Sequence, residues 1–239
     1  MKSVSLAQAA GATSYPGRGI VAGRSRDGER ALLAYFIMGR SQNSRNRVFV
    51  EEGDGLRTQA HDPSKMTDPS LIIYHPVRTL GDLTIVTNGD QTDTIYQALQ
   101  RGQSFAQALR SRTFEPDAPN FTPRISCLCT LEQGQMELAM GILKAGDPQG
   151  QSARRFFFEY SPVLPGQGWF LHTYMGDGNP IPAFEGEPEW VEMPDTAQQT
   201  AQALWNSLDP DNKVSLWVRS IHLTTGQVET LCCNKHLGD

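Results

Sequence analysis

The segment Ala31–Met38, with the sequence Ala-Leu-Leu-Ala-Tyr-Phe-Ile-Met, is a nearly continuous apolar run. A second run, Gly19–Gly23, precedes it, and Arg26-Asp27-Gly28 lies between the two. An Asp-Gly pair between two such runs is typical of a tight hairpin turn. The sequence therefore predicts that the fold opens on two paired strands.

Short runs rich in β-branched residues, bounded by Gly, Pro and Asp, predict further strands along the chain. They are Val48–Val50, Leu71–Val77, Leu83–Thr87, Ile125–Thr130 and Met136–Leu143, and toward the C-terminus Val214–Leu223 and Gln227–Cys232. Arg155–Tyr160 and Trp169–Tyr174 form another expected pair. Strand and turn signals together give about ten strands.

Three helices are expected among these strands. From Thr92 the apolar residues follow helical spacing up to a stop at Gly102, and Ser104 caps a second, short helix through Leu109. Asp195 caps a third, whose inner face would comprise Gln198, Ala201, Leu204, Trp205 and Leu208. Because strands and helices do not alternate strictly, the pattern favours an α+β fold of antiparallel sheets with outer helices.

Composition is that of an ordinary globular protein. The 239 residues, 38% hydrophobic and 20% charged, allow one large domain with a sizeable core and exclude a collagen-like, disordered or disulfide-framework protein. No repeat or linker divides the chain. The acid-rich segment Gly176–Asp195 is expected to be a surface loop within that domain.

Net charge and cysteine spacing indicate which macromolecular partners and metal sites are not expected. Lys+Arg 21 and Asp+Glu 26 give 21 − 26 = −5, which disfavours nucleic acid and acidic membranes as partners. No segment resembles a secretory signal or a bilayer span, which favours a cytoplasmic protein. The cysteines match no metal-site spacing and are expected to be small buried thiols: Cys127, Cys129, Cys232 and Cys233.

Arginine is concentrated between residues 15 and 47, where seven arginines face two acids and give a local charge of +5. The arginines are Arg18, Arg24, Arg26, Arg30, Arg40, Arg45 and Arg47, and the acids are Asp27 and Glu29. Guanidinium groups match phosphate oxygens bidentately, and neighbouring Ser41, Ser44 and Asn46 add neutral donors. The pattern indicates a site for a phosphorylated small molecule; a solvated basic loop is the alternative, and Arg26 and Arg30 fit the turn.

The segment Asn88–Thr94 runs from a predicted strand directly into a predicted helix. Such a junction presents free backbone N–H groups that can hold a phosphate, a carbonyl oxygen or an oxyanion. Plain helix capping by Asp90 or Thr92 explains the same residues equally well.

Three further polar groups are candidates for a site. Tyr74 and His75 lie in an otherwise apolar run, although a lone tyrosine is usually a satisfied core residue. Glu115 and Asp117 could act as an acid/base pair, but a salt bridge to Arg124 is the commoner arrangement. His172 and Tyr174 share one face of their strand, which suits a polar pocket or a hydrated surface. Signatures of nucleotide-cofactor, metal or α/β-hydrolase chemistry are absent from the sequence, so any chemistry is expected to be cofactor-free.

Four short motifs follow one another between residues 15 and 126. They are Tyr15-Pro16-Gly17-Arg18-Gly19; Ala34-Tyr35 with Gly39-Arg40-Ser41 and Asn46-Arg47; Asn88-Gly89 followed by Thr92-Asp93-Thr94-Ile95; and Thr122-Pro123-Arg124-Ile125. In order and spacing they resemble the archaeal-type inosine monophosphate (IMP) cyclohydrolase family. Beyond them the resemblance thins to Thr173-Tyr174.

This resemblance implies a four-layer αββα fold of the N-terminal-nucleophile (Ntn) hydrolase type, with an extension over residues 1–14 and a single domain over 15–239. It also implies the last step of purine synthesis. The carboxamide nitrogen of 5-formamidoimidazole-4-carboxamide ribonucleotide attacks the neighbouring formyl carbon, and water leaves as the ring of IMP closes. The substrate is a nucleoside monophosphate, no cofactor or metal is needed, and homo-oligomers are expected.

The resemblance assigns catalysis to three residues: Arg47 and Tyr74 stabilise the oxyanion, and Glu115 shuttles a proton. The residues assigned to substrate binding are Arg18, Arg40, Ser41, Asn46, Asn88, Gly89, Thr92 and Arg124. Small differences in loop length leave Arg45 open beside Arg47, and Asp117 open beside Glu115. Two rival functions are an Ntn amidohydrolase that uses Thr13 or Ser14 as nucleophile and a purine-nucleotide sensor without turnover.

Overall fold

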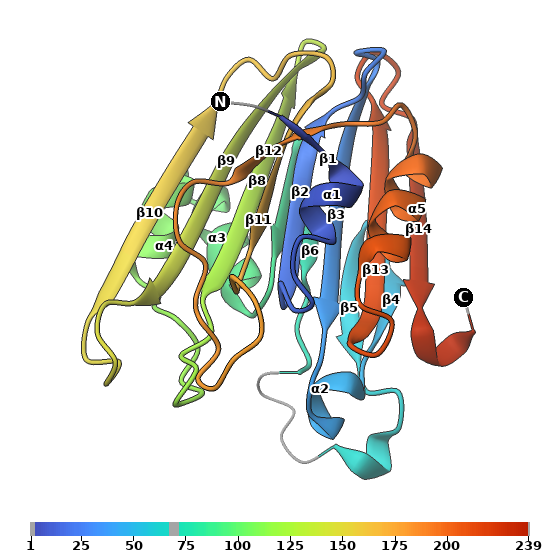
Figure 1. Ribbon diagram of the computed structural model, residues 1–239. Helices are drawn as coiled ribbons and strands as arrows, with labels where there is room; N and C mark the ends of the chain where they lie inside the picture. Colours follow the sequence, from blue (N-terminus) through green and yellow to red (C-terminus); the bar gives the residue numbers. More distant parts are fainter. Residues whose placement is uncertain (1–2, 67–71, 239) are drawn as a thin grey trace.

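The computed structural model describes residues 3–66 and 72–238, and these contain fourteen strands and five α-helices (Figure 1). The first sheet has the order β1 (Val4–Ser5), β12 (Glu189–Glu192), β11 (Gln167–His172), β2 (Arg18–Arg24), β3 (Arg30–Met38), β13 (Lys213–His222), β14 (Val228–Asn234). The second has the order β10 (Ala153–Tyr160), β9 (Gln135–Ala145), β8 (Arg124–Glu132), β7 (Leu83–Thr87), β6 (Val77–Leu80), β5 (Gly55–Gln59), β4 (Val48–Glu52). The α+β class is confirmed.

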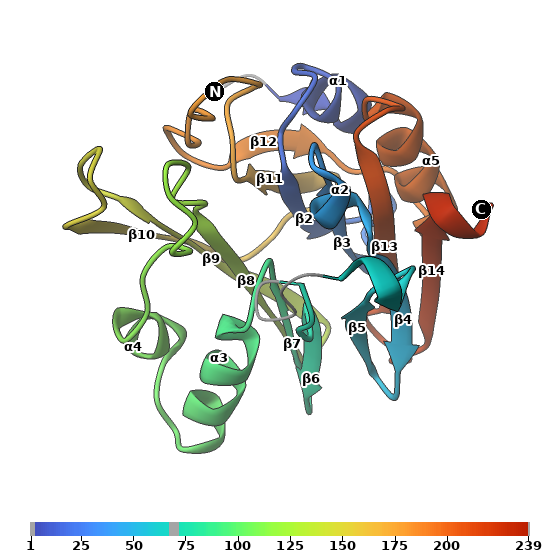
Figure 2. The same ribbon diagram turned by 90° about the horizontal axis from the view of Figure 1, so that it is seen from below.

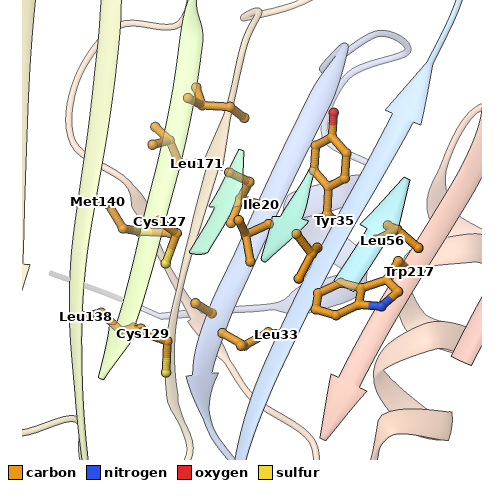
Figure 3. Close-up of a cluster of buried hydrophobic side chains, with 14 of the residues drawn as sticks. Ile20, Leu33, Tyr35, Leu56, Cys127, Cys129, Leu138, Met140, Leu171 and Trp217 are labelled. Atoms are coloured by element: carbon orange, nitrogen blue, oxygen red, sulfur yellow. The ribbon is translucent and has the colours of Figure 1, made fainter. Parts of the chain in front are cut away.

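Strand β3 is apolar from Ala31 onward because both of its faces are buried there. Leu33 and Tyr35 point into the core between the two sheets, together with residues of β2, β8, β9 and β13 (Figure 3). Leu32 and Phe36 point the other way, against α1 (Leu6–Ala10) and α5 (Ala197–Ser207). One strand therefore joins the core between the sheets to the core beneath the helices.

Helices cover the outer side of each sheet (Figure 2). The pair α3 (Gln91–Gln100) and α4 (Phe105–Arg110) packs on the second sheet through Ile95, Phe105 and Leu109. Ser104 caps α4, as predicted. The short α2 (Gln42–Arg45) and the 3₁₀ turns Pro63–Lys65 and Lys235–Leu237 lie outside the sheets.

The predicted pair of β2 with β3 is confirmed. The strands predicted at 125–130, 136–143, 214–223 and 227–232 are also present, and they pair as β8 with β9 and β13 with β14. In the first hairpin Gly28 has φ +78°, a conformation that favours glycine. Cys127 and Cys129 are buried between the sheets as expected, whereas Cys232 and Cys233 on β14 are half-buried.

The predicted pair of residues 155–160 and 169–174 is wrong. β10 is the edge of the second sheet and pairs with β9, while β11 lies between β12 and β2 in the first. The chain crosses between the sheets after Tyr160, whose ring stacks on that of Trp169 with centroids 3.8 Å apart. Alternation shows that a segment is a strand, but not in which sheet it pairs.

The strand predicted from residue 71 is also wrong over residues 72–76, and residue 71 lies outside the described part of the chain. β6 begins only at Val77. The segment before it is a loop held by Thr58 of the unpredicted strand β5: the Tyr74 N–H donates to Thr58 Oγ1 at 2.9 Å, and the Thr58 N–H donates to the Tyr74 carbonyl at 2.9 Å. A side chain from elsewhere satisfies the backbone, so no strand forms there.

Three details toward the C-terminus differ from expectation. Thr196, not Asp195, caps α5, because its side chain accepts the Gln199 N–H while Asp195 accepts the Asp27 N–H. The buried face of α5 is Ala197, Thr200, Ala201 and Leu204, and Gln198 is exposed. The segment 176–195 is not all loop, because β12 lies within it.

Replacing Thr58 with Val should lower the free energy of unfolding by about 1–3 kcal/mol, since the swap keeps the shape but leaves the Tyr74 N–H unpaired. Urea denaturation measures the loss. Thr84→Val is the control: Thr84 is 4% exposed on β7, and its hydroxyl makes no hydrogen bond within the described part of the chain. A loss no larger than that of the control would contradict the role given to Thr58.

Candidate active site

The predicted site residues gather at one end of the two sheets, the lower end in Figure 1. Arg18 begins β2, and Gly39 follows the end of the neighbouring β3. In the second sheet Asn88 follows β7, and Arg124 begins β8. Because these pairs are antiparallel, the start of one strand lies beside the end of the other, and both sheets deliver polar groups to the same place.

Two arginines share the buried centre of the site. Arg47 is 1% exposed, and its Nη1 is buried without a hydrogen-bond partner; the same holds for Nε of Arg18. Burial lowers the pKa of Arg47, and the positive charge of Arg18 lowers it further. Burial acts in the same direction on Arg18, yet Tyr15 and Glu115 outweigh it and raise the pKa. A buried and a half-buried cation, each with a spare donor, suit the binding of an anion.

Two tyrosine hydroxyls meet beside these arginines. The Tyr74 and Tyr35 oxygens are 2.8 Å apart, and both side chains are buried. Burial raises the pKa of Tyr74, while Arg47 and Arg18 oppose the increase. Tyr74 is therefore a protonated hydroxyl close to two guanidinium groups, an arrangement suited to binding negative charge.

Glu115 is the carboxyl group of this centre. It is 5% exposed, and burial raises its pKa to about 7, against the opposing effect of Arg18 and Arg124. A carboxyl group with a pKa near neutrality can both accept and donate a proton. Asp117 instead binds its own loop, accepting the Thr122 N–H at 2.7 Å and the Thr122 hydroxyl.

Arg124 forms its ion pair with Asp90, 2.7 Å away, so the salt bridge expected with Glu115 or Asp117 is replaced by one across the helix junction. Its Nη1 also donates to Gln91 Oε1 at 2.7 Å. A Cβ atom at position 89 would lie 2.4 Å from Arg124 Nη1 and 2.6 Å from Gln91 Oε1, so the ends of both side chains would have to shift. Asp90 makes no side-chain cap for α3, because its carboxylate binds Arg124 and Arg112.

Asn88 is not free to read a substrate with its side chain. Its amide donates to the Pro123 carbonyl at 2.9 Å and accepts from the Ile125 N–H and from Gln91 Nε2. The residue joins the end of β7 to the start of β8. The backbone of Gly89 is engaged as well, because its N–H donates to Thr87 Oγ1 at 3.2 Å and its carbonyl accepts from the Thr87 and Thr92 hydroxyls.

Four other predicted binding residues also have partners within the protein. Asn46 holds the backbone of Asp62 through both ends of its amide, and Ser41 caps α2. The Thr92 hydroxyl binds Thr87 Oγ1 at 2.6 Å. Arg40 pairs with Asp177 and lies over the Tyr15 ring, with its Cζ 5.3 Å from the centroid. These side chains shape the walls around the arginine centre.

The structure separates Arg45 from Arg47. Arg45, at the end of α2, donates to the Gly39 carbonyl and to Asn212 Oδ1, both at 2.8–2.9 Å and away from Glu115. Arg47 donates its Nε to the Ser44 carbonyl at 3.0 Å and turns its terminal nitrogens inward. It is Arg47, therefore, that lies in the centre.

Sequence reasoning assigned no role to two tyrosines, Tyr174 in the site and Tyr35 behind it. Tyr35 lies within the apolar run and is the one residue there with a polar end. Tyr174 alternates with His172 in the sequence; its hydroxyl lies 2.5 Å from Thr122 Oγ1, and its ring stacks on Tyr15. The available signal for both was a tyrosine hydroxyl among buried residues.

Among the described residues, no group of three His, Cys, Asp or Glu side chains could hold a metal ion. No described helix is long and apolar enough to cross a membrane. The site is thus a set of arginine, tyrosine and carboxyl groups.

Fold and site together define an α+β protein that can bind a small anion and move a proton. Residues 15–226 match the family described as "IMP cyclohydrolase-like protein". The chain is similar to the IMP cyclohydrolase of Methanopyrus kandleri, with 36% identity over 182 residues, 72% of this chain and 89% of that protein. The IMP cyclohydrolases of Methanococcus aeolicus and Halobacterium salinarum are 28% and 31% identical, over 67% and 47% of this chain and 74% and 55% of their own lengths. The chain belongs to the IMP cyclohydrolase-like family.

Glu115→Gln should raise the free energy of unfolding at pH 8 by up to about 3 kcal/mol and by much less at pH 5. With a pKa of about 7 in the folded protein against an ordinary 4.5, the folded state holds the extra proton between these values. The free energy of unfolding of the wild type therefore falls as pH rises through this window. The side chain of the Gln variant stays neutral, so its free energy of unfolding does not fall for this reason. Urea denaturation at both pH values tests this, with exposed Glu159→Gln as the control; an equal effect at pH 5 and pH 8 would refute it.

Proposed function

We propose that the protein is an IMP cyclohydrolase, which closes the pyrimidine ring of 5-formamidoimidazole-4-carboxamide ribonucleotide and releases water. The observation that carries the proposal is the meeting of Arg18, Arg47, Tyr74 and Glu115 at one buried point, within a chain of this family. The reaction forms one C–N bond and expels one oxygen as water. It needs an anchored phosphate, aligned substituents and transfer of two protons to the departing oxygen, one from the attacking amide nitrogen and one from the formamido nitrogen.

Arg18 and Arg124 anchor the phosphate or ribose of the substrate, and Arg40 lies at the rim. Support comes from the unpaired Nε of Arg18 and from the near-complete burial of Arg124, which is 6% exposed. Asn88 and Gly89, whose polar groups are bound within the protein, shape the wall beside the carboxamide. Holding the amide nitrogen against the formyl carbon supplies much of the acceleration of an intramolecular reaction.

Arg47 and Tyr74 stabilise the negative charge that develops on the formyl oxygen during attack. The unpaired Nη1 of Arg47 and the Tyr74 hydroxyl are the donors for it. In a buried site these donors are already oriented, so little reorganisation is needed as charge develops.

Glu115 takes a proton from the attacking amide nitrogen and delivers it to the departing oxygen. The formamido nitrogen gives up the second proton of the water as its double bond to the new ring carbon forms. The two uses of Glu115 require a carboxyl group that is readily both ionised and protonated, and a pKa of about 7 supplies this. Asp117, occupied by Thr122, keeps the Glu115 loop in place.

The proposal extends to the architecture. The outer helix pairs and facing sheets support the four-layer αββα arrangement of Ntn hydrolases, with residues 15–239 as one domain and 1–14 as an extension. A homo-oligomer acting in the cytoplasm completes the proposal and rests on the family resemblance. Size-exclusion chromatography with light scattering tests the oligomer.

Purified protein mixed with 5-formamidoimidazole-4-carboxamide ribonucleotide, without metal or folate, should form IMP far faster than a protein-free control, as followed by chromatography. Tight IMP binding without turnover would instead select the nucleotide sensor. An intact mass that begins at Thr13 or Ser14, with amide hydrolysis, would select the Ntn amidohydrolase. Either result would refute the cyclohydrolase.

Replacing Glu115 with Gln should lower kcat by about 10²–10⁴-fold and abolish its pH dependence. In the wild type the ionised carboxylate accepts the amide proton, so kcat should rise with pH through a midpoint near 7. Rates between pH 5 and pH 9 measure both effects. Glu115→Asp keeps the carboxyl group and should retain a rising limb; an unchanged profile in the Gln variant would remove the proton-transfer role.

A further inference from the structure

Tyr35 lies behind the site and not within it. Its side chain is fully buried on β3, with the ring stacked on Phe49 at a centroid distance of 5.5 Å. Figure 3 shows the ring within the apolar cluster between the sheets, with the hydroxyl at its outer end. The described residues offer that hydroxyl one hydrogen-bond partner, the Tyr74 oxygen at 2.8 Å.

The burial of the two tyrosines differs in a way that decides which one donates. A hydroxyl has one proton and can accept in two further directions. If Tyr74 donated, the Tyr35 proton would be left without an acceptor in an apolar core, which is unfavourable. If Tyr35 donates, its only proton is used, and the proton of Tyr74, which is 6% exposed, stays available.

The charged neighbours of the pair favour the same orientation. Arg18 and Arg47 both act on the two tyrosines, and a guanidinium group can donate but cannot accept. The acceptor that remains for the Tyr74 proton is an oxygen on the site side, either of Glu115 or of a bound ligand. Backbone hydrogen bonds to Thr58 fix the position of Tyr74.

We propose that Tyr35 is a positioning residue: it donates to the Tyr74 oxygen from the core, and thereby directs the Tyr74 proton toward the substrate oxygen on which charge develops. This inference rests on the proposed cyclohydrolase function and adds to it a residue outside the site. Without Tyr35, the Tyr74 hydroxyl can rotate, and it loses the bond that polarises it as a donor.

Tyr35→Phe removes one oxygen and keeps the ring in the core. Its kcat for IMP formation should fall about five- to tenfold, the effect of one hydrogen bond, while KM changes less than about twofold because the substrate does not touch Tyr35. Tyr74→Phe should lower kcat by a larger factor than Tyr35→Phe. The double variant should match Tyr74→Phe alone, because Tyr35 acts only through the Tyr74 hydroxyl.

The matched control is Tyr160→Phe, the same deletion at a half-buried tyrosine stacked on Trp169 in the core. It should leave kcat unchanged, and thermal melting establishes that each variant is folded. A merely structural role of Tyr35 would instead give losses that add in the double variant, or a shift in KM as large as that in kcat.

The outcomes separate this inference from the function on which it rests. If the wild type forms no IMP, the cyclohydrolase proposal fails and the inference fails with it. If the wild type forms IMP and Tyr35→Phe keeps wild-type kcat, or the losses add, the positioning role alone is overturned.

Discussion

The structure depends on one constraint, the crowding of two like charges beside a single buried carboxyl group. Arg18 is half-buried and Arg47 is 1% exposed; the two repel each other, and Glu115 lies beside them with a pKa of about 7. Such a group is unfavourable to fold and persists only where the surrounding structure over-determines it. The strand ends supply that rigidity: Arg18 is fixed on β2 by its own N–H bond to Thr173 Oγ1, and both sheets meet where these residues lie.

Around this centre, the polar residues that resemble ligand contacts serve instead to hold loops. Asn46 fixes the chain after β5, Asn88 ties β7 to β8, and Asp117 closes its loop on Thr122. Each uses short side-chain bonds to backbone groups that lack strand partners. As a result, asparagine and aspartate side chains hold the loops in place. The longer arginine, tyrosine and glutamate side chains keep donors and acceptors that face the centre.

Local signals in the sequence predicted what local interactions decide. The β2–β3 hairpin follows from Gly28, and α4 from the cap at Ser104. What failed depends on distant partners: the loop around Tyr74 looks like a strand until Thr58 captures its backbone, and β11 alternates like a partner of β10 although it belongs to the other sheet. The same limit applied to the candidate site, where the features that depend on distant partners could not be predicted. The number of arginines indicated an anion site, but only tertiary structure could separate Arg47 from Arg45, or Glu115 from Asp117.

Burial also explains how a chain with a net charge of −5 can hold positive charge in one place. At physiological ionic strength, exposed charges act over about 8 Å, so acids elsewhere on the surface do not cancel the charge of the buried arginines. Arg47 and Arg124 are 1% and 6% exposed, and a polymer backbone cannot reach guanidinium groups at that depth. The dry surroundings strengthen electrostatic contacts to these arginines and to the Tyr74 hydroxyl. Under the proposed function, the burial that raises the pKa of Glu115 therefore also favours a small anionic substrate.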